Sequence, residues 1–532
     1  MKKICLYDTT LRDGAQTEGV SFTISDKIAI AKKLDELGVD YIEAGWPGAN
    51  PKDAEVFTRL ANVRFKSAKL VAFGSTRKAG VKASDDAVLA AMVNSGAPVV
   101  TLVGKCSESQ VKRVLEVDLQ ENLNMVKDSI SYLKSLGREV FFDAEHFFDG
   151  YQENPRYCLA VLQGAQDSGV DGVVLCDTNG GCLPQDIYKA VKEVKEQLQV
   201  EIGIHCHNDS DCAVANSLQA VLAGATQVQG TINGLGERCG NANLCTIIPA
   251  LKLKLGFNEQ VSDYQLSRLR EVAIFVSERA NMALPNNMPY VGWSAFSHKA
   301  GLHVSGLRRW SGSYQHVEPE QVGNQMRTLV SEQSGRASIL QKATELKIDL
   351  NGQDRQIADI LQKVKEMESH GFQYENAEAS FELLIKRGES AYHPPFELLN
   401  YMVVVEKRRR ASGNKNGAEL LAEAIIKLAV DNEVFHTVSE GDGPVNALDS
   451  AFRQALSPKY PQIERVKLLD YKVRLIGQSS STSSITRVLI ESSNGQHTWH
   501  TVGAGENIID ASWLALSDSM EYFLINQAKM IG

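Results

Sequence analysis

The feature that most constrains this chain is a unit that recurs along its first 235 residues. Each unit is an amphipathic stretch with a glycine near its end, followed by a short run of apolar or β-branched residues. Strands this apolar, each followed by a helix, predict a parallel sheet covered by helices. We expect eight strands, at 4–7, 41–44, 70–73, 98–103, 139–142, 172–176, 201–205 and 226–232.

Glycines mark the ends of the expected helices. Five strands follow a helix-ending glycine, at Gly38, Gly96, Gly137, Gly169 and Gly224. Glycine readily takes the left-handed conformation that ends a helix. Eight such units in about 235 residues have the size of a (β/α)8 TIM barrel, an α/β fold. An open, doubly wound sheet is the structural alternative.

The second half of the chain has a different character. From about 265 to 395 it is helical and polar, with 355–367 as the clearest amphipathic segment. An internal repeat follows, Phe435-His-Thr-Val and Trp499-His-Thr-Val, and each copy lies between strand-like runs and a helix. This pattern predicts an α+β domain of duplicated βββα units. Its strand-to-helix turns can hold a small carboxylate, and a dimerisation module without a ligand is the alternative.

Composition limits the function. The net charge of -9 argues against a nucleic-acid or anionic-membrane partner. All nine cysteines lie between Cys5 and Cys245, without a C-x-x-C pair, which indicates reduced thiols and a cytoplasmic protein. We expect no membrane span, since no run approaches the roughly 20 apolar residues that one needs, and no signal peptide.

Polar side chains follow several of the predicted strands. Asp13 follows the first strand, Glu145 the fifth and Thr178 the sixth, and His205 and His207 end the seventh. Because a strand projects residues i and i+2 from one face, both imidazoles can bind one cation. Barrel enzymes carry their chemistry at the carboxyl ends of the strands. We therefore expect Asp13 and the two histidines to share a divalent metal, with Mn²⁺, Mg²⁺ and Zn²⁺ all suitable.

Other interpretations of these residues stay open. An aspartate after a strand is commonly a turn or cap residue, and the glycine-rich segment 233–243 by itself indicates only a loop. His298 and His303 lie outside the expected barrel and fit a structural role equally well. Two histidines and a carboxylate also occur in non-haem iron oxygenases. A metal-dependent carbon–carbon lyase and a non-catalytic amino-acid sensor are further alternatives.

Four motifs carry a family resemblance: D-T-T-L-R-D-G-x-Q at 8–16, H-x-H at 205–207, G-x-G-E-R-x-G-N at 234–241 and S-G-R-A-S at 334–338. Together they resemble the 2-isopropylmalate, homocitrate and citramalate synthases over essentially the whole chain. Within that family, the length and the segments 45–53, 371–375 and 442–449 are most similar to the longer citramalate synthases.

The resemblance assigns roles to individual residues. It implies a metal held by Asp13, His205 and His207, with Asn241 at or near the ion. It implies catalytic roles for Arg12, Glu145 and His303, with His303 in the base system for acetyl-CoA. It implies substrate binding by Arg12, Gln16, Glu43, Thr178 and Tyr314. Ser305 stands where relatives often carry aspartate, so the proton relay around His303 departs from the family pattern.

The resemblance also implies an activity. A base removes a methyl proton from acetyl-CoA, the enolate attacks the ketone of pyruvate, and water then cleaves the thioester to give (R)-citramalate and CoA. Another 2-oxo acid, as used by 2-isopropylmalate or homocitrate synthases, is the alternative substrate. The expected parts are a catalytic barrel at 1–265, helical linker subdomains at 266–395 and a regulatory amino-acid-binding domain at 396–532. The implied effector is isoleucine, with leucine as the alternative. The resemblance also implies a homodimer and a role in isoleucine biosynthesis.

Overall fold

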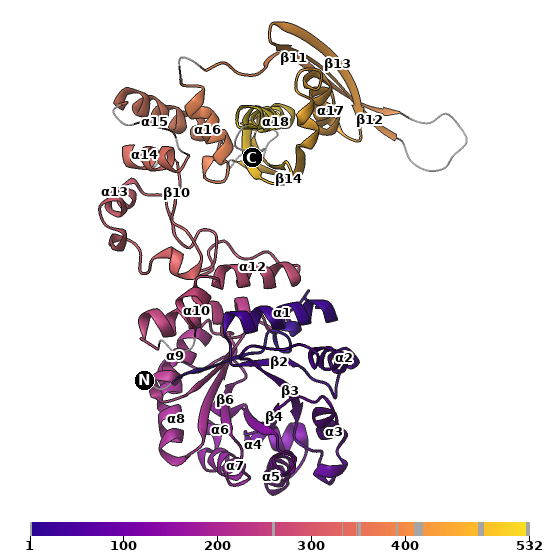
Figure 1. The fold of residues 1–532 in the computed structure, drawn as a ribbon, viewed down its shortest axis with the longest axis vertical. Helices are drawn as coiled ribbons and strands as arrows, with labels where there is room; N and C mark the ends of the chain where they lie inside the picture. Colours follow the sequence, from indigo (N-terminus) through magenta and orange to yellow (C-terminus); the bar gives the residue numbers. More distant parts are fainter. Residues whose placement is uncertain are drawn as a thin grey trace, which may run out of the picture. The chain divides into compact units, whose positions relative to one another are not determined.

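The structure is a computed structural model that divides into two compact units (Figure 1). The first unit comprises Met1–Phe296 and Gln315–Met326, and the second comprises Ser297–Tyr314 and Arg327–Gly532. The described residues are 3–257, 261–331, 334–346, 348, 350, 353–389, 392–408, 419–476 and 484–527.

The first unit contains a closed barrel of eight parallel strands in sequence order. The barrel closes because β1 pairs in parallel with β8 along its whole length. This confirms the predicted (β/α)8 barrel and excludes the open sheet. The strands are β1 Cys5–Asp8, β2 Tyr41–Gly45, β3 Lys69–Ser75, β4 Val99–Lys105, β5 Glu139–Glu145, β6 Gly172–Asp177, β7 Glu201–Cys206 and β8 Gln227–Gly230.

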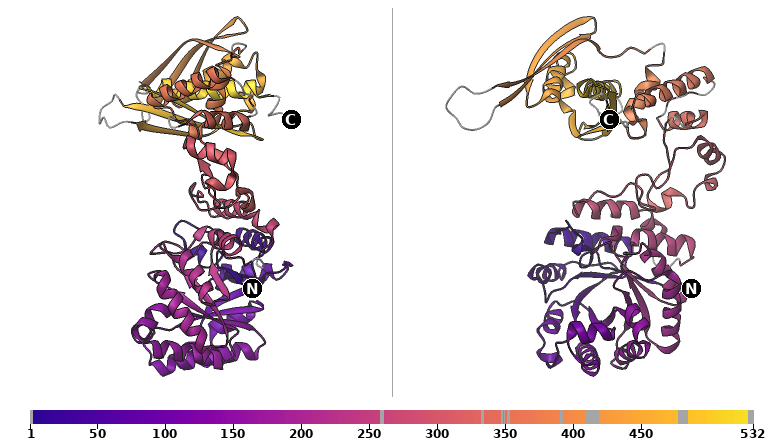
Figure 2. Two further views of the ribbon diagram at one scale, coloured as in Figure 1. Left: turned by 90° about the vertical axis from the view of Figure 1, so that its left-hand side faces the viewer. Right: turned by 180° about the vertical axis from the view of Figure 1, so that it is seen from behind.

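Helices surround the barrel on its outer face (Figure 2). The first helix is capped at its start by Thr23, whose side chain forms a capping box with Asp26, and at its end by Gly38 in the left-handed conformation. All five glycines predicted to end helices have a positive φ. The helices are α1 Ile24–Leu37, α2 Pro51–Leu60, α3 Ala87–Asn94, α4 Glu108–Gln110, α5 Leu119–Ser135, α6 Phe147–Glu153, α7 Pro155–Asp167, α8 Pro184–Gln197, α9 Ala213–Ala223, α10 Leu244–Pro249, α11 Asp263–Leu266 and α12 Leu269–Arg279.

The strand period separates two layers of packed side chains. Residues such as Leu6 and Ile42 belong to the large buried core of this unit. The neighbouring residue Tyr7 belongs instead to a small cluster with Val71, Val99 and Phe141. Since successive side chains on a strand point to opposite faces, one layer packs against the helices and the other fills the barrel.

The segment after β1 is fastened to the segment after β8. The backbone N–H of Thr9 donates to the carbonyl of Gly230 at 2.9 Å. The hydroxyl of Thr10 donates to Asp8 at 2.8 Å and accepts the backbone N–H of Ile232 at 2.9 Å. These buried hydrogen bonds fix where the next residues of the chain, including Asp13, enter the mouth of the barrel.

The second unit begins with a short parallel pair of strands and a set of helices. The pair is β9 Ser297–His298 and β10 Arg327–Thr328. The helices are α13 Gly301–Arg309, α14 Arg336–Glu345, α15 Asp354–Ser369 and α16 Glu378–Lys386. The predicted amphipathic segment 355–367 lies within α15, where Ile357, Ile360 and Val364 are buried.

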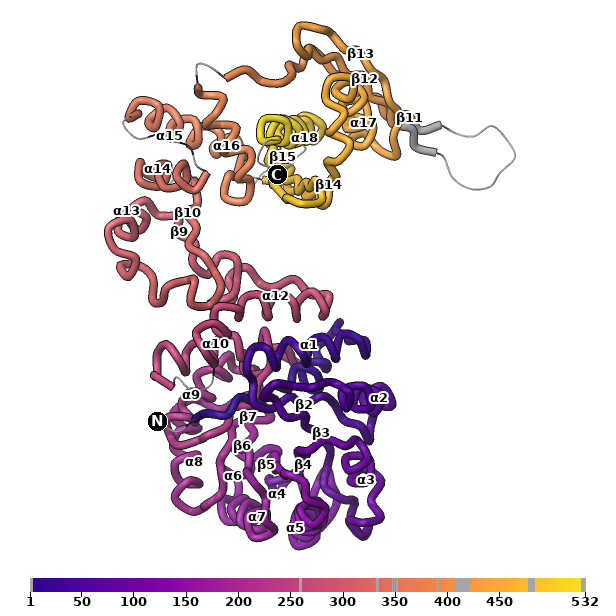
Figure 3. The backbone as a smooth tube through the Cα atoms, in the orientation of Figure 1, coloured from indigo at the N-terminus to yellow at the C-terminus, as the bar shows by residue number. Residues whose placement is uncertain are grey.

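The rest of this unit repeats one arrangement twice. Each half is a three-stranded antiparallel sheet followed by a helix, so the predicted duplication of βββα units is confirmed. The two helices, α17 and α18, lie side by side (Figure 3). The first half is β11 Glu397–Arg408, β12 Glu419–Val430, β13 Glu433–Gly441 and α17 Pro444–Leu456, and the second is β14 Lys467–Ile476, β15 Ile485–Ser493, β16 Thr498–Gly505 and α18 Ile508–Ile525.

In the parts of the chain that the structure describes, no helix combines the length and the apolar character needed to cross a membrane.

Candidate active site

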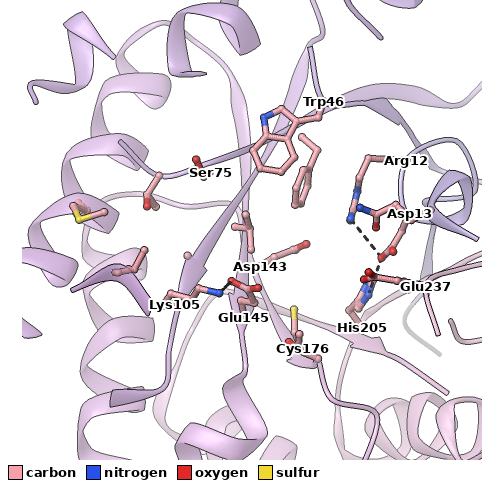
Figure 4. A pocket seen from close by; sticks show the side chains of 18 of the residues that line it. Arg12, Asp13, Trp46, Ser75, Lys105, Asp143, Glu145, Cys176, His205 and Glu237 are labelled. Carbon is pink, nitrogen blue, oxygen red and sulfur yellow. Dashed lines mark ion pairs between the residues drawn. The ribbon is translucent and has the colours of Figure 1, made fainter. Parts of the chain in front are cut away.

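A cavity of about 590 Å³ lies at the carboxyl ends of the barrel strands (Figure 4). Residues from several strand ends, far apart in the sequence, contribute to its wall. Seven of the residues singled out from the sequence line it: Arg12, Asp13, Gln16, Glu145, Thr178, His205 and His207. Glu43 and Asn241 are buried but are not among the lining residues. The barrel thus gathers most of the expected site at one mouth.

Asp13, His205 and His207 meet as the H-x-H spacing predicts. Oδ2 of Asp13 lies 3.3 Å from Nε2 of His205 and 4.0 Å from Nε2 of His207. The two Nε2 atoms are 3.4 Å apart. Within the described residues, these three side chains form the one cluster of histidine, cysteine or acidic groups that could hold a metal ion. One nitrogen from each histidine and one carboxylate oxygen face a common point.

The charge states of this cluster suit a divalent cation. Burial alone would raise the pKa of Asp13, but Arg12 and the two histidines hold it well below its usual range. Burial lowers the pKa of His207 to about 4, and His205 beside it adds to the shift. Burial opposes a charge on His205 too, yet its contact with Asp13 raises its pKa. A bound metal ion would take the place of a proton at Nε2 of His205, next to Asp13.

Two buried polar atoms beside the cluster are unsatisfied. Nδ1 of His207 and Oδ1 of Asn241 have no hydrogen-bond partner among the described residues. The backbones of His207 and Asn241 form an antiparallel bridge, so the two residues are neighbours. A side chain at Gly236 would collide with the Asn241 amide, which explains one glycine of the G-x-G-E-R-x-G-N loop. The unpaired amide oxygen of Asn241 is therefore available as a ligand atom for a metal ion.

Arg12 is held in place from two sides. Its Nε donates to Glu43 at 2.6 Å, and its guanidinium stacks on the Phe73 ring with 3.9 Å to the ring centre. Glu43 is fully buried and also accepts hydrogen bonds from the hydroxyls of Tyr7 and Thr9. Burial would lower the pKa of Arg12, but Glu43 and Asp13 raise it. The result is a fixed cation in the cavity wall.

Glu145 and Thr178 lie at the ends of neighbouring strands. Glu145 pairs with Lys105 at 2.6 Å, on the wall across from Arg12 and Asp13 (Figure 4). The Thr178 hydroxyl accepts the backbone N–H of His146 at 2.8 Å, so its own hydrogen can donate to a ligand carboxylate. The carbonyl of Thr178 accepts from Arg238, which also pairs with Asp209. This wall of the cavity therefore carries both an ion pair and an oriented hydroxyl.

His303 and Tyr314 belong to the other compact unit. Their rings stack with 4.1 Å between centres and 24° between planes. His298 approaches His303 edge-on at 6.5 Å. These contacts group two residues that the family resemblance singles out, and their roles in the reaction stay predictions.

Sequence reasoning missed several polar residues in and beside the cavity, among them Lys105, Asp143 and Gln229. Asp143 is two residues before Glu145 on β5, and Lys105 ends β4. The period of a strand puts Asp143 and Glu145 on the same face, so this signal was present in the sequence. Burial, followed by the nearby charge of Glu43, raises the pKa of Asp143 to about 7.

A family model places this barrel, with its histidine–aspartate cluster, in the HMGL-like class. The model described as HMGL-like matches residues 3–276. The model for a homocitrate synthase post-HMGL domain matches 290–371, and that for the LeuA allosteric (dimerisation) domain matches 375–524.

Proteins named (R)-citramalate synthase are similar over the full length. The Aquifex aeolicus protein is 50% identical, with 99% of each chain covered. The Geobacter sulfurreducens protein is 49% identical, with 100% of this chain and 99% of that one covered. The chain belongs to the (R)-citramalate synthase family and is therefore an enzyme. The solved HMG-CoA lyase of Bacillus subtilis matches 54% of this chain and 96% of its own, at 20% identity and a TM-score of 0.47.

The geometry predicts that Asp13→Asn abolishes tight binding of Mn²⁺, since it removes the anionic donor of the cluster. We expect the Kd for Mn²⁺ alone, measured by electron paramagnetic resonance, to rise by more than about 100-fold, beyond the effect of outer-shell partners. Asp209→Asn is the matched control, because Asp209 pairs with Arg238 at the rim, outside the cluster. Equal affinities of the two variants would contradict the assignment.

Proposed function

We propose that this enzyme condenses acetyl-CoA with pyruvate and then hydrolyses the thioester, giving (R)-citramalate and CoA. The observation that carries the proposal is full-length similarity to (R)-citramalate synthases together with a cation-ready cluster at the barrel mouth. In this reaction the acetyl group becomes an alkyl group on transfer, so the enzyme is of the acyltransferase type. Acetyl-CoA and pyruvate are the proposed substrates.

Asp13, His205 and His207 would hold the divalent ion, Mn²⁺, Mg²⁺ or Zn²⁺, with Asn241 offering its unpaired amide oxygen. Three protein ligands leave open positions at such a centre. When bound, the ion would act as a Lewis acid on the ketone of the 2-oxo acid. The donor set fits this role, because burial keeps His207 neutral and Arg12 keeps Asp13 ionised.

The other residues of the cavity would bind and orient the 2-oxo acid. Arg12 presents a fixed positive charge where the ketone oxygen becomes an alkoxide, and such preorganised charge is a major source of catalysis. Glu43 contributes through Arg12, since it is fully buried behind that side chain. Gln16 lines the same wall, and the oriented hydroxyl of Thr178 suits the substrate carboxylate.

Proton transfer would involve Glu145 and His303. The Glu145–Lys105 pair keeps a carboxylate in the cavity wall. The proposed base removes a proton from the methyl group of acetyl-CoA, the new carbanion forms the carbon–carbon bond at the ketone carbon, and the alkoxide takes up a proton. Water then breaks the thioester and releases CoA. His303 stacks on Tyr314, and we propose that these neighbouring residues act together on the thioester substrate.

The proposed division of labour follows the predicted parts of the chain. Residues 1–265 are catalytic, 266–395 link, and 396–532 bind the feedback effector, for which isoleucine is the first candidate and leucine the second. The match to the LeuA allosteric (dimerisation) domain supports regulation and a homodimer. Nine free cysteines are consistent with a reducing compartment such as the cytoplasm. Citramalate formation would serve isoleucine biosynthesis, a branched-chain amino-acid pathway.

Substrate choice is tested with acetyl-CoA and a panel of pyruvate, 2-oxobutyrate, 2-oxoisovalerate and 2-oxoglutarate. We expect pyruvate to give the highest kcat/KM for thiol release, with citramalate as the product identified by mass spectrometry. His207→Ala is the inactive control, because it removes one of the two imidazoles of the cluster. A preference for 2-oxoisovalerate or 2-oxoglutarate would assign the enzyme to another branch of the family.

The role of His303 is tested by His303→Ala in the same thiol assay. Loss of a general base typically costs about 10²–10⁴-fold in rate, so we expect kcat to fall by at least about 100-fold. The KM for pyruvate should change little, because the ketone is proposed to bind at the barrel mouth. His298→Ala is the matched control from the same segment. A near-normal kcat for His303→Ala would remove His303 from the mechanism.

Regulation is tested by deleting residues 396 onward. We expect the shortened enzyme to retain part of its catalysis and to lose inhibition by isoleucine, because the proposed effector domain is absent. The full-length enzyme assayed with isoleucine, and separately with leucine, provides the reference. Inhibition that persists in the shortened enzyme would place the effector site in the remaining residues.

A further inference from the structure

A chain of hydrogen bonds runs from the candidate ion site to a buried carboxylate that the proposed reaction leaves unused. Nδ1 of His205 lies 2.9 Å from Oε1 of Gln229. Nε2 of Gln229 donates to Oδ1 of Asp143 at 3.1 Å. All three side chains are buried, and Gln229 is fully so. These two hydrogen bonds thus link three different strands, β7, β8 and β5.

The register of the barrel builds this link. His205 and Gln229 are direct partners across the pair β7–β8, so their side chains leave the sheet next to each other on one face. Asp143 comes from β5 and lines the same cavity (Figure 4). The inner layer of the barrel therefore determines which neighbours His205 has.

The chemistry of the three groups selects one arrangement. The amide of glutamine has one donor end and one acceptor end, and the donor end of Gln229 points at Oδ1 of Asp143. With its NH₂ group given to Asp143, Gln229 offers its oxygen to His205. His205 must then carry a proton on Nδ1, so Nε2, which faces Asp13 and His207, is the nitrogen available to a metal ion.

We propose that Asp143 is a positioning residue for the ion site: it fixes the amide of Gln229, and Gln229 fixes the ring and tautomer of His205 for metal binding. This inference rests on the proposed ion site and deepens it. Ligating histidines commonly have such an outer partner on their second nitrogen. His207 differs, because its Nδ1 has no partner among the described residues. His205 is therefore the prearranged ligand of the pair.

The test measures the Kd for Mn²⁺ alone, by electron paramagnetic resonance, on the full-length enzyme without substrates. Gln229→Met keeps the size of the side chain but removes the link, and we expect the Kd to rise by about 10- to 100-fold. Gln227→Met is the matched control. Gln227 is a buried glutamine on the same strand and face, and its side-chain oxygen has no hydrogen-bond partner among the described residues. We expect the Kd of Gln227→Met for Mn²⁺ to stay within about threefold of that of the unaltered enzyme, because Gln227 is not an outer partner of a ligand.

Variants at Asp143 separate positioning from a direct catalytic role. Asp143→Asn can still present an oxygen to Gln229, so we expect nearly normal Mn²⁺ affinity. Asp143→Leu cannot, and we expect affinity to fall by about tenfold or more, with kcat recovering partly at saturating Mn²⁺. A normal Mn²⁺ affinity of Asp143→Leu with a low kcat would overturn the proposal and indicate contact with the substrate.

Two further results would overturn the proposal. One is unchanged affinity in Gln229→Met, and the other is equal weakening in Gln229→Met and Gln227→Met, which would indicate general damage to the barrel. If circular dichroism shows that Gln229→Met does not fold, the Mn²⁺ affinities of Asp143→Asn and Asp143→Leu test the proposal by themselves. Failure of the unaltered enzyme to bind Mn²⁺ is a distinct outcome, which would remove the ion site itself.

Discussion

The pairing of β1 with β8 is the interaction on which the rest of the site depends. Without it, Asp13 and His205 would lie at opposite ends of an open sheet, because one follows the first strand and the other ends the seventh. Closure is secured by parallel pairing along β1 and by hydrogen bonds of Thr9 and Thr10 to the segment after β8. The candidate cation-binding cluster of Asp13, His205 and His207 is therefore a consequence of barrel closure.

Burial at the barrel mouth sets the chemistry of the cluster. In water, the charge of Asp13 would be well solvated and His207 would be partly protonated at neutral pH. In the barrel, burial keeps the imidazole of His207 neutral and so able to bind a metal ion, while Arg12 keeps Asp13 anionic. Arg12 is itself held by fully buried Glu43. A low-dielectric site with fixed charges strengthens each interaction with an anionic substrate or a developing alkoxide.

Much of the fold and the site could be predicted from local patterns. The eight strands were predictable because apolar runs and helix-ending glycines are local signals. The approach of His205 and His207 was predictable because H-x-H spacing on a strand places both rings on one face, and Asp13 was predictable because it follows a strand at the same end of the barrel. The link between Asp143 and Gln229 was missed for a physical reason: the strand period predicts which face each side chain is on, but not which residue of another strand becomes its partner. Glu43 illustrates the same limit, since the structure places it behind Arg12 and not at the cavity surface.

The amino-acid sequence by itself determined the succession of βα units, the duplicated βββα module and the identity of the candidate ligands, because period, glycine placement and residue type are written along the chain. Only the tertiary structure decided which distant residues share a space. It paired Glu145 with Lys105, and it placed Gln229 between His205 and Asp143. Register and closure create these contacts, and both depend on hydrogen bonds between strands that are far apart in the sequence.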